Sequence, residues 1–288
     1  MMTNKLQRYE IILPTTTRCS NIGNIFKPTA LILDSGVGGL SVHKEIRNSL
    51  PNIRYIYVFD NAGFPYGGKN KSFIIERVLK IVYAVQKKHI LSIIIIACNT
   101  ASIMTLPYLR ESFDIPIVGV VPAIKSAAQI THNGIIGLLA TQLTIRYSYT
   151  HNLIARFAAQ CNIKMLGSSE LVFLAEHKLQ GEEVNNNIIK KIIQPWLSRS
   201  KPPDTVVLGC THFSLLRKEI AAVLPEGINL IDSCSAIAHR VSCILGNQEN
   251  YINIENNIAY VTQNNSYTQN LLPVLKFLGF SRMIELRL

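Results

Sequence analysis

Two similar short segments, far apart in the chain, constrain the fold more than any other feature of the sequence. Residues 93–102 read IIIIACNTAS and residues 205–214 read TVVLGCTHFS, so each has an apolar run, a small residue and a cysteine. A short apolar run bounded by small polar residues is typical of a buried strand. The Asn and Thr residues after each cysteine are typical of the start of a helix. Cys98 and Cys210 are therefore each predicted at the carboxyl end of a strand, facing a helix N-terminus.

The matched surroundings of the two cysteines indicate two similar halves. Open α/β sheets bind their ligands at the carboxyl ends of the strands. A thiol beside a helix N-terminus has a pKa below its usual value of about 8.5. A single buried cysteine is commonly inert packing, but two in matched positions predict that each half presents a thiol to one shared cleft.

The rest of the chain continues the same alternation of strands and helices, which is typical of parallel sheets covered on both faces. We therefore predict an α/β fold of two similar, doubly wound parallel-sheet domains, with the active site in the cleft between them. The predicted parts are an N-terminal extension (1–28), a discontinuous first domain (29–122 plus 234–288) and a second domain (123–233). A long helix is predicted over residues 143–160, and further helices are predicted over 213–224 and 270–278.

Composition excludes several classes of protein. The chain has 288 residues, of which 48% are hydrophobic and 16% charged, so it can bury a substantial core and is not disordered. Its net charge is +11, but Lys and Arg are scattered without a basic run. This favours compositional bias over nucleic-acid binding, and a basic cleft would suit an acidic small substrate.

Neither a secretory signal nor a membrane-spanning segment is predicted, because the apolar run near residues 90–98 is too short to cross a bilayer. A cytoplasmic location follows as an expectation, and disulfides are not expected there. The six cysteines contain no CxxC pair, so the usual zinc and thioredoxin signatures are absent from the sequence.

Two further segments are candidates for the cleft. Residues 34–39, DSGVGG, follow a short strand, and their glycines allow a tight turn and a close approach of backbone to a ligand. Asp34 alone favours a turn or helix cap over a carboxylate beside the substrate. Residues 64–67, FPYG, are either an ordinary surface turn or part of a pocket, with the Tyr66 hydroxyl and the Gly67 amide as donors.

Two thiols that face each other across a cleft have three chemical uses. They can form a redox pair, or they can bind a metal together with His212 and Asp34, although this set has no recognised spacing. They can also be two acid/base catalysts on opposite faces of one substrate, which inverts a stereocentre. Hydrogen-bonding neighbours such as His212, Asp34 or Glu176 would then set the protonation state of each thiol.

The motifs themselves resemble the glutamate racemase family, from about Leu31 to the C-terminus. The matching segments are DSGVGGLSV (34–42), FPYG (64–67), ACNTAS (97–102), VGVVPAIK (118–125) and LGCTHFSLL (208–216). Residues 146–158 and the N-terminal extension resemble the proteobacterial branch of that family.

The resemblance implies an isomerase, independent of pyridoxal phosphate, that interconverts L- and D-glutamate and supplies D-glutamate for peptidoglycan synthesis. No cofactor and no metal are implied. The implied catalytic residues are Cys98 for the D-glutamate proton, Cys210 for the L-glutamate proton, Asp34 and His212 as their respective assistants, and Glu176 on the Cys210 side. The implied substrate-binding residues are Asp34, Ser35, Tyr66, Gly67, Asn99, Thr100, Thr144, Thr211 and His212. Cys234 and Cys243 have no role in the family and are expected in the core.

Several alternatives stay open at this point. Aspartate racemase shares the two-cysteine chemistry, and some members of the glutamate racemase family act on DNA gyrase, so a DNA- or gyrase-binding role is a second alternative. A thiol redox protein is a third. The resemblance also allows a homodimer, and it allows regulation by a UDP-linked cell-wall precursor, as in some proteobacterial relatives.

Overall fold

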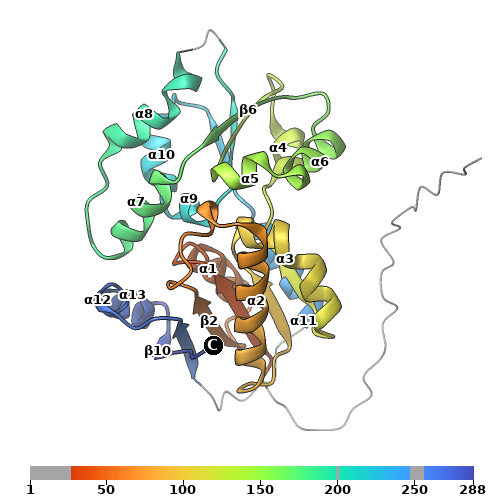
Figure 1. Cartoon of the computed structure of the whole chain (residues 1–288). Coiled ribbons are helices and arrows are strands. Elements are labelled where there is room, and N and C mark those ends of the chain that lie inside the picture. Colours follow the sequence, from red (N-terminus) through yellow and green to blue (C-terminus); the bar gives the residue numbers. More distant parts are fainter. Residues whose placement is uncertain (1–26, 199–200, 247–255) are drawn as a thin grey trace, which may run out of the picture.

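Two parallel β-sheets form the framework of the molecule (Figure 1), in a computed structural model that describes residues 27–198, 201–246 and 256–288. The six-stranded sheet has the order β10-β9-β2-β1-β3-β4 and the four-stranded sheet the order β6-β5-β7-β8, with all neighbours parallel. The strands are β1 Thr29–Asp34, β2 Arg54–Phe59, β3 Ile93–Ile96, β4 Ile117–Gly119, β5 Ile135–Ala140, β6 Asn162–Gly167, β7 Thr205–Leu208, β8 Asn229–Ile231, β9 Asn257–Val261 and β10 Phe280–Glu285.

The two sheets repeat one topology. The order β2-β1-β3-β4 in the first sheet corresponds strand for strand to β6-β5-β7-β8 in the second, and β9 and β10 extend only the first. The predicted fold of two similar parallel-sheet halves is confirmed. In each half the second strand lies on one side of the first, and the chain then crosses over to add the later strands on the other side. This reversal of strand order creates a switch point beside β1 in one half and β5 in the other.

Helices cover both faces of the first sheet, as the alternation of side chains along β1 requires. Ala30 and Ile32 belong to one core, packed with α1 and α11, whereas Leu31 and Leu33 belong to another, packed with α2 and α3. The helices of this half are α1 Leu40–Ser49, η1 Tyr66–Gly68, α2 Lys71–Gln86, α3 Asn99–Ser112, α11 Cys234–Leu245, α12 Ser266–Asn270 and α13 Leu272–Phe277.

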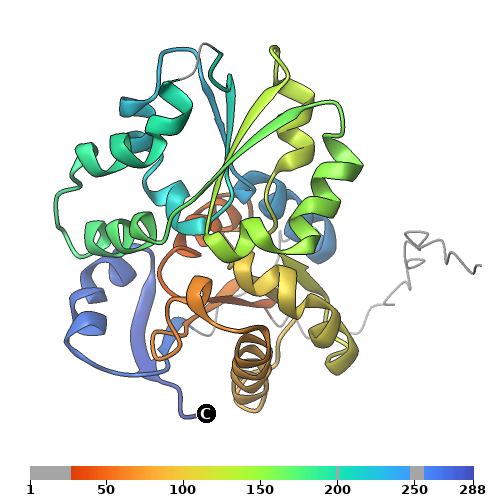
Figure 2. The same cartoon turned by 45° about the horizontal axis from the view of Figure 1, so that its top comes forward.

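The four-stranded half lies above the six-stranded half in the views of Figures 1 and 2. Its helices are α4 Ile124–Ile130, α5 Gln142–Arg146, α6 Ser148–Phe157, α7 Glu170–Leu179, α8 Asn186–Leu197, α9 Thr211–Leu215 and α10 Arg217–Val223. The two segments that pass between the halves lie side by side, because the Ser233 hydroxyl donates to the Val121 carbonyl. The domain limits 29–122 plus 234–288 and 123–233 stay a proposal, and residues 1–26 of the predicted extension lie outside the described residues.

The predicted helices 143–160 and 213–224 are each two short helices instead, whereas the predicted helix 270–278 corresponds to α13, which α12 precedes. The Thr150 hydroxyl binds the Thr144 carbonyl, and Tyr147 is extended between α5 and α6. The Lys178 ammonium binds the Leu215 carbonyl where α9 ends. Pro273 opens α13 and has no N–H to continue α12.

In the described residues, no helix combines the length and apolarity needed to cross a membrane.

Candidate active site

Both cysteines lie at the switch points of their sheets and line one cavity. Cys98 occupies the N-cap position of α3, two residues after β3 ends, and Cys210 occupies that of α9, two residues after β7 ends; both have extended backbone and neither makes a side-chain capping bond. The cavity has a volume of about 160 Å³ and lies at the carboxyl ends of strands from both halves. Its lining consists of Ser35, Pro65, Tyr66, Gly67, Gly68, Cys98 and Thr100 from the first half, and Thr141, Gln142, Ser169, Val172, Cys210 and His212 from the second.

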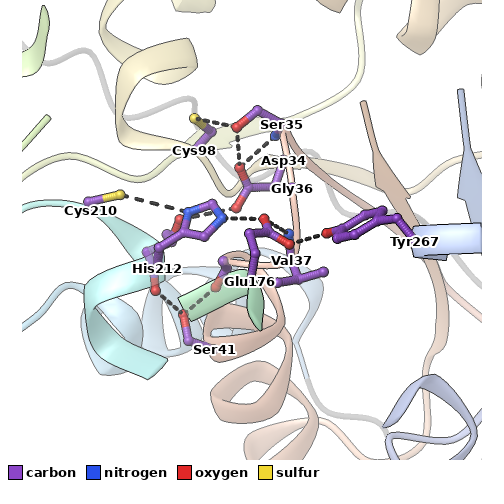
Figure 3. Close-up of polar contacts among 12 residues, drawn as sticks. Asp34, Ser35, Gly36, Val37, Ser41, Cys98, Glu176, Cys210, His212 and Tyr267 are labelled. Carbon is purple, nitrogen blue, oxygen red and sulfur yellow. Dashed lines mark hydrogen bonds and ion pairs between the residues drawn. The ribbon is translucent and has the colours of Figure 1, made fainter. Parts of the chain in front are cut away.

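Asp34 and Ser35 form the polar surroundings of Cys98 (Figure 3). Asp34 is fully buried and accepts from the Ser35 amide at 2.6 Å and from the Thr211 hydroxyl at 3.0 Å. The Ser35 hydroxyl lies 3.3 Å from Asp34 Oδ1 and 3.9 Å from Cys98 Sγ. Ser35 therefore lies between the carboxylate and the thiol. Asp34 caps no helix, since α1 has no side-chain cap, and its place beside a bound substrate stays a prediction.

Burial sets the ionisation of this pair. It raises the pKa of Asp34, although the positive charge of His212 opposes the shift. It also raises the pKa of the Cys98 thiol well above the usual value, and the Asp34 charge adds to that effect. The expected lowering of a thiol pKa at a helix N-terminus is therefore wrong for Cys98, because desolvation outweighs the donors of α3. A neutral thiol at Cys98 can give a proton.

The surroundings of Cys210 are different and contain a second buried carboxylate. His212 Nδ1 lies 3.8 Å from Cys210 Sγ, and Nε2 of the same ring lies 2.6 Å from Glu176 Oε1. Glu176 Oε1 also accepts from the Val37 amide at 3.0 Å, and its Oε2 accepts from the Tyr267 hydroxyl. Burial acts to lower the pKa of His212, but its bonds to Cys210 and Glu176 outweigh burial and raise that pKa well above the usual value. An imidazole of this kind can take the proton of Cys210.

The glycine-rich loop lets this histidine–carboxylate pair reach the first half. A Cβ on Gly36 would lie 2.1 Å from Glu176 Oε1, and one on Gly38 would lie 2.4 Å from His212 Nδ1. The glycines do permit a close approach, but the groups that approach are side chains from the second half of the chain, and the predicted approach to a ligand stays a prediction. The first half can therefore touch His212 and Glu176 only because these positions lack side chains.

Three threonine hydroxyls lie together at the cavity. Thr100 Oγ1 is 3.1 Å from Thr141 Oγ1 and 3.2 Å from Thr144 Oγ1. Thr141 and Gln142 line the cavity but are not among the residues predicted from the sequence. Thr141 follows β5 directly, as Cys98 closely follows its strand, so its position at a strand end was the signal that could have found it. Hydroxyl groups at this point can bind a carboxylate.

The remaining predicted binding residues fall into two groups. Ser35, Tyr66, Gly67, Thr100 and His212 line the cavity. Asp34, Asn99, Thr144 and Thr211 are buried beside it, where Asp34 accepts from Thr211.

The predicted donor role of the Tyr66 hydroxyl needs correction. That hydroxyl donates to Asp60 at 2.7 Å, and Asp60 also binds the Arg77 guanidinium. A hydroxyl has one hydrogen to donate, so in this arrangement Tyr66 lines the cavity while its hydroxyl hydrogen is committed to Asp60.

The other cysteines lie apart from this cavity. Cys234 is buried, as predicted, in the core that α1 and α11 form against the six-stranded sheet, which is called the first core below. Cys243 is exposed on α11, so its predicted place in the core is wrong. The five cysteines of the described chain are all free thiols. No group of three His, Cys, Asp or Glu side chains in residues 27–198, 201–246 and 256–288 has an arrangement that could hold a metal ion.

Comparison with known proteins assigns the family. The Asp/Glu/hydantoin racemase family matches residues 40–241, well over half of the chain. This chain belongs to that family. Its relatives include the glutamate racemase of Serratia proteamaculans, 59% identical over 261 residues that span 90% of this chain and 91% of the relative. The glutamate racemase of Photorhabdus laumondii is 54% identical over 268 residues, 93% of each chain.

Solved structures of family members have the same fold. The Escherichia coli glutamate racemase, in complex with L-glutamate and the activator UDP-MurNAc-Ala, has a TM-score of 0.87 and 54% identity, covering 91% of this chain and 98% of that one. A glutamate racemase isoform from Bacillus anthracis has a TM-score of 0.77 and 27% identity, with coverage of 91% and 97%. The racemase fold therefore extends over nearly all of the chain.

Proposed function

We propose that this chain is a cofactor-independent glutamate racemase that uses Cys98 and Cys210 as its two bases. The observation that carries the proposal is that both thiols line one cavity while each has its own polar partners. The high identity to glutamate racemases supports glutamate over aspartate as the substrate. A redox role and a role in binding DNA or gyrase have no comparable support.

From L-glutamate, the Cys210 thiolate takes the α-proton, and the Cα–H electron pair remains on the substrate as a carbanion. His212 Nδ1 holds the proton that Cys210 gave up, and Glu176 stabilises the resulting imidazolium. The Cys98 thiol then donates its proton to the opposite face of Cα, which produces D-glutamate and a Cys98 thiolate. Proton exchange with solvent restores the starting state.

From D-glutamate the same steps run in reverse, and Cys98 must act as the base. Asp34 and Ser35 are the groups placed to accept or relay its proton. The raised pKa of Asp34 brings this carboxyl closer to the range in which it can exchange protons with a thiol. The two half-reactions thus use different partner sets on the two faces of the substrate.

Substrate binding is proposed to rest on hydroxyls and backbone amides. Thr100 and Thr141 present hydroxyls at one place in the cavity, and Ser35 presents another near Cys98. The volume of about 160 Å³ suits a ligand of amino-acid size, since a cavity of about 150 Å³ can hold benzene. The further predicted binding residues Gly67, Asn99, Thr144 and Thr211 stay predictions.

The proposal extends to the cellular role. D-glutamate would serve peptidoglycan synthesis, in a reducing cytoplasm that keeps the free thiols of the cavity reduced. Activation by a UDP-linked muramyl precursor is proposed because the Escherichia coli glutamate racemase was solved with such an activator. Formation of a homodimer stays a prediction.

The test is exchange of the α-proton in D₂O. L-glutamate is incubated with the purified protein and EDTA, without pyridoxal phosphate, while ellipticity follows racemisation and NMR follows deuterium at Cα. Racemisation with deuterium incorporation is expected, and Cys98→Ala or Cys210→Ala should each abolish racemisation, whereas Cys243→Ser should not. A parallel assay adds UDP-MurNAc-Ala. The proposal fails if glutamate is racemised neither in the presence nor in the absence of that precursor. It also fails if Cys98→Ala or Cys210→Ala keeps full activity.

A further inference from the structure

We propose that Tyr267 is a positioning residue for the Cys210 half of the reaction, an inference that rests on the proposed function. Its hydroxyl donates to Glu176, the carboxylate that holds His212 (Figure 3). The three residues and Cys210 form one continuous chain of contacts that begins on α12 and ends at the cavity. Tyr267 is not among the residues predicted from the sequence.

The Glu176 carboxylate shows why the tyrosine matters. Its Oε1 accepts from both His212 Nε2 and the Val37 amide, whereas for its Oε2 the hydroxyl of Tyr267 is the one donor in the described residues. Figure 3 shows Tyr267 approaching from the side opposite His212. Two donors on Oε1 hold only that oxygen in place and give the other oxygen no partner. A third donor on the other oxygen fixes its plane and keeps Oε1 aligned with His212.

The segment that carries Tyr267 is itself firmly held. α12 begins with a reciprocal capping box, in which the Asn265 side chain accepts from the Thr268 amide and the Thr268 hydroxyl accepts from the Asn265 amide. The preceding Thr262 hydroxyl donates to buried Asp60 at 2.6 Å, and the Tyr267 ring packs against the first core. A hydroxyl placed by so many local contacts costs little entropy to hold in position.

The contact also joins the two halves and affects only one of the two thiols. Tyr267 follows β9 of the six-stranded sheet, whereas Glu176 lies on α7 of the other half. Cys98 has Ser35 as its neighbour and has no part in this chain of contacts. Loss of the Tyr267 hydroxyl should therefore slow the proton transfers of Cys210 and leave those of Cys98 unchanged.

Tyr267→Phe tests the proposal, because it removes the hydroxyl and keeps the ring. Tyr55→Phe is the matched control, since Tyr55 is a buried tyrosine of the same core whose hydroxyl donates to the Leu50 carbonyl. We expect kcat of Tyr267→Phe to fall about 10- to 100-fold in both directions with little change in KM, and Tyr55→Phe to match the wild type. Tyr267→Met is the second variant without a hydroxyl if the first does not fold.

Primary deuterium isotope effects on kcat/KM distinguish positioning from general damage. With [2-²H]L-glutamate the Cys210 step is isotope-sensitive, and its effect should rise because that step becomes rate-limiting. With [2-²H]D-glutamate the Cys98 step is sensitive, and its effect should fall.

Unchanged activity in Tyr267→Phe, or lost activity with both isotope effects moving together, would overturn the proposal. An inactive wild-type enzyme would instead refute the proposed function.

Discussion

His212 Nε2 lies 2.6 Å from Glu176 Oε1, and the side chains of both residues are almost completely buried. An ionised carboxylate only accepts hydrogen bonds, so the proton of the ring lies on Nε2 and Nδ1 is left facing Cys210. This relationship orients the base that the Cys210 thiol needs, and it explains why two residues 36 positions apart act together.

Glu176→Gln should reduce kcat about 100-fold, because the amide removes the charge that stabilises the His212 imidazolium. The folded protein should still bind glutamate, since Glu176 does not line the cavity. Steady-state kinetics in both directions checks this, and a variant with wild-type kcat would contradict it.

The same variant should change how stability depends on pH. The pKa of His212 is raised in the folded state, so its contribution is fully present below the unfolded value of about 6.5 and is lost as the pH rises through the folded value. The difference in unfolding free energy between wild type and Glu176→Gln should therefore be larger at pH 6 than at pH 9. Urea denaturation at several pH values measures this difference in unfolding free energy. An equal difference at every pH would argue against the conclusion that Glu176 raises the pKa of His212.

Cys98 should react slowly with iodoacetamide at pH 7, and its reactivity should increase with pH. Burial, together with the charge of Asp34, raises the pKa of its thiol, and the thiolate is the nucleophile. The exposed thiol of Cys243 should be modified first. Mass spectrometry of the alkylated peptides gives the order of reaction, with Cys243→Ser as the control. Modification of Cys98 before Cys243 would contradict the expectation.

Gly36→Ala should abolish most of the activity without disrupting the apolar cores. The added methyl would lie 2.1 Å from Glu176 Oε1 and 3.0 Å from His212 Nε2, so the pair must move away from the loop. We expect kcat to fall more than about 100-fold, since a displacement of about 1 Å can cost that factor. Gly68→Ala is the stability control, because a methyl there meets nothing within 4 Å and its unfolding temperature should equal that of the wild type. Retained activity in Gly36→Ala would contradict the prediction, because it would mean that the glycine-rich loop shifts to accommodate the methyl group.

Asp60→Asn should destabilise the protein by about 2–4 kcal/mol. Asp60 is fully buried and binds Arg77, Tyr66 and Thr262 together, so the substitution leaves a guanidinium without its counter-charge. This expected loss of stability lies toward the low end of the range for buried ion pairs, because the Arg77 side chain is 23% exposed. Glu76→Gln, in an exposed pair with Lys80, should leave the denaturation midpoint unchanged. Equal effects of the two substitutions would contradict the prediction.

His43 should make the fold sensitive to acid. Both ring nitrogens are buried without a hydrogen-bond partner in the described chain, between the rings of Tyr55 and Phe280, and burial lowers the pKa of His43 to about 3. The unfolded chain takes up the proton near pH 6.5, so this contribution to stability is lost as the pH falls from about 6.5 toward 3. In His43→Leu the slope of stability against pH between 4 and 6 should be smaller by up to about 1.4 kcal/mol per pH unit. Urea denaturation of both proteins checks this, and parallel curves would exclude it.

The sequence by itself determined the framework and the two thiols. Strands buried on both faces must be apolar runs, so residues 93–96 and 205–208 could be recognised locally, and parallel strands bring their carboxyl ends to one edge. Cys98, Cys210 and His212 lie within a few residues of such ends, which is why their place at the cavity was predictable, whereas Asp34 was selected only by the family resemblance.

Only the tertiary structure decided which groups meet and in what state of protonation. Tyr267 lies 91 positions from Glu176, and Thr141 lies 41 positions from Thr100, so no local pattern could indicate that they touch. The pKa of Cys98 also differs from the local expectation, because desolvation depends on every element packed around the thiol and outweighs the one helix terminus beside it. The type of secondary structure is a local property that hydrophobic periodicity indicates, whereas contacts between distant residues are properties of the whole fold.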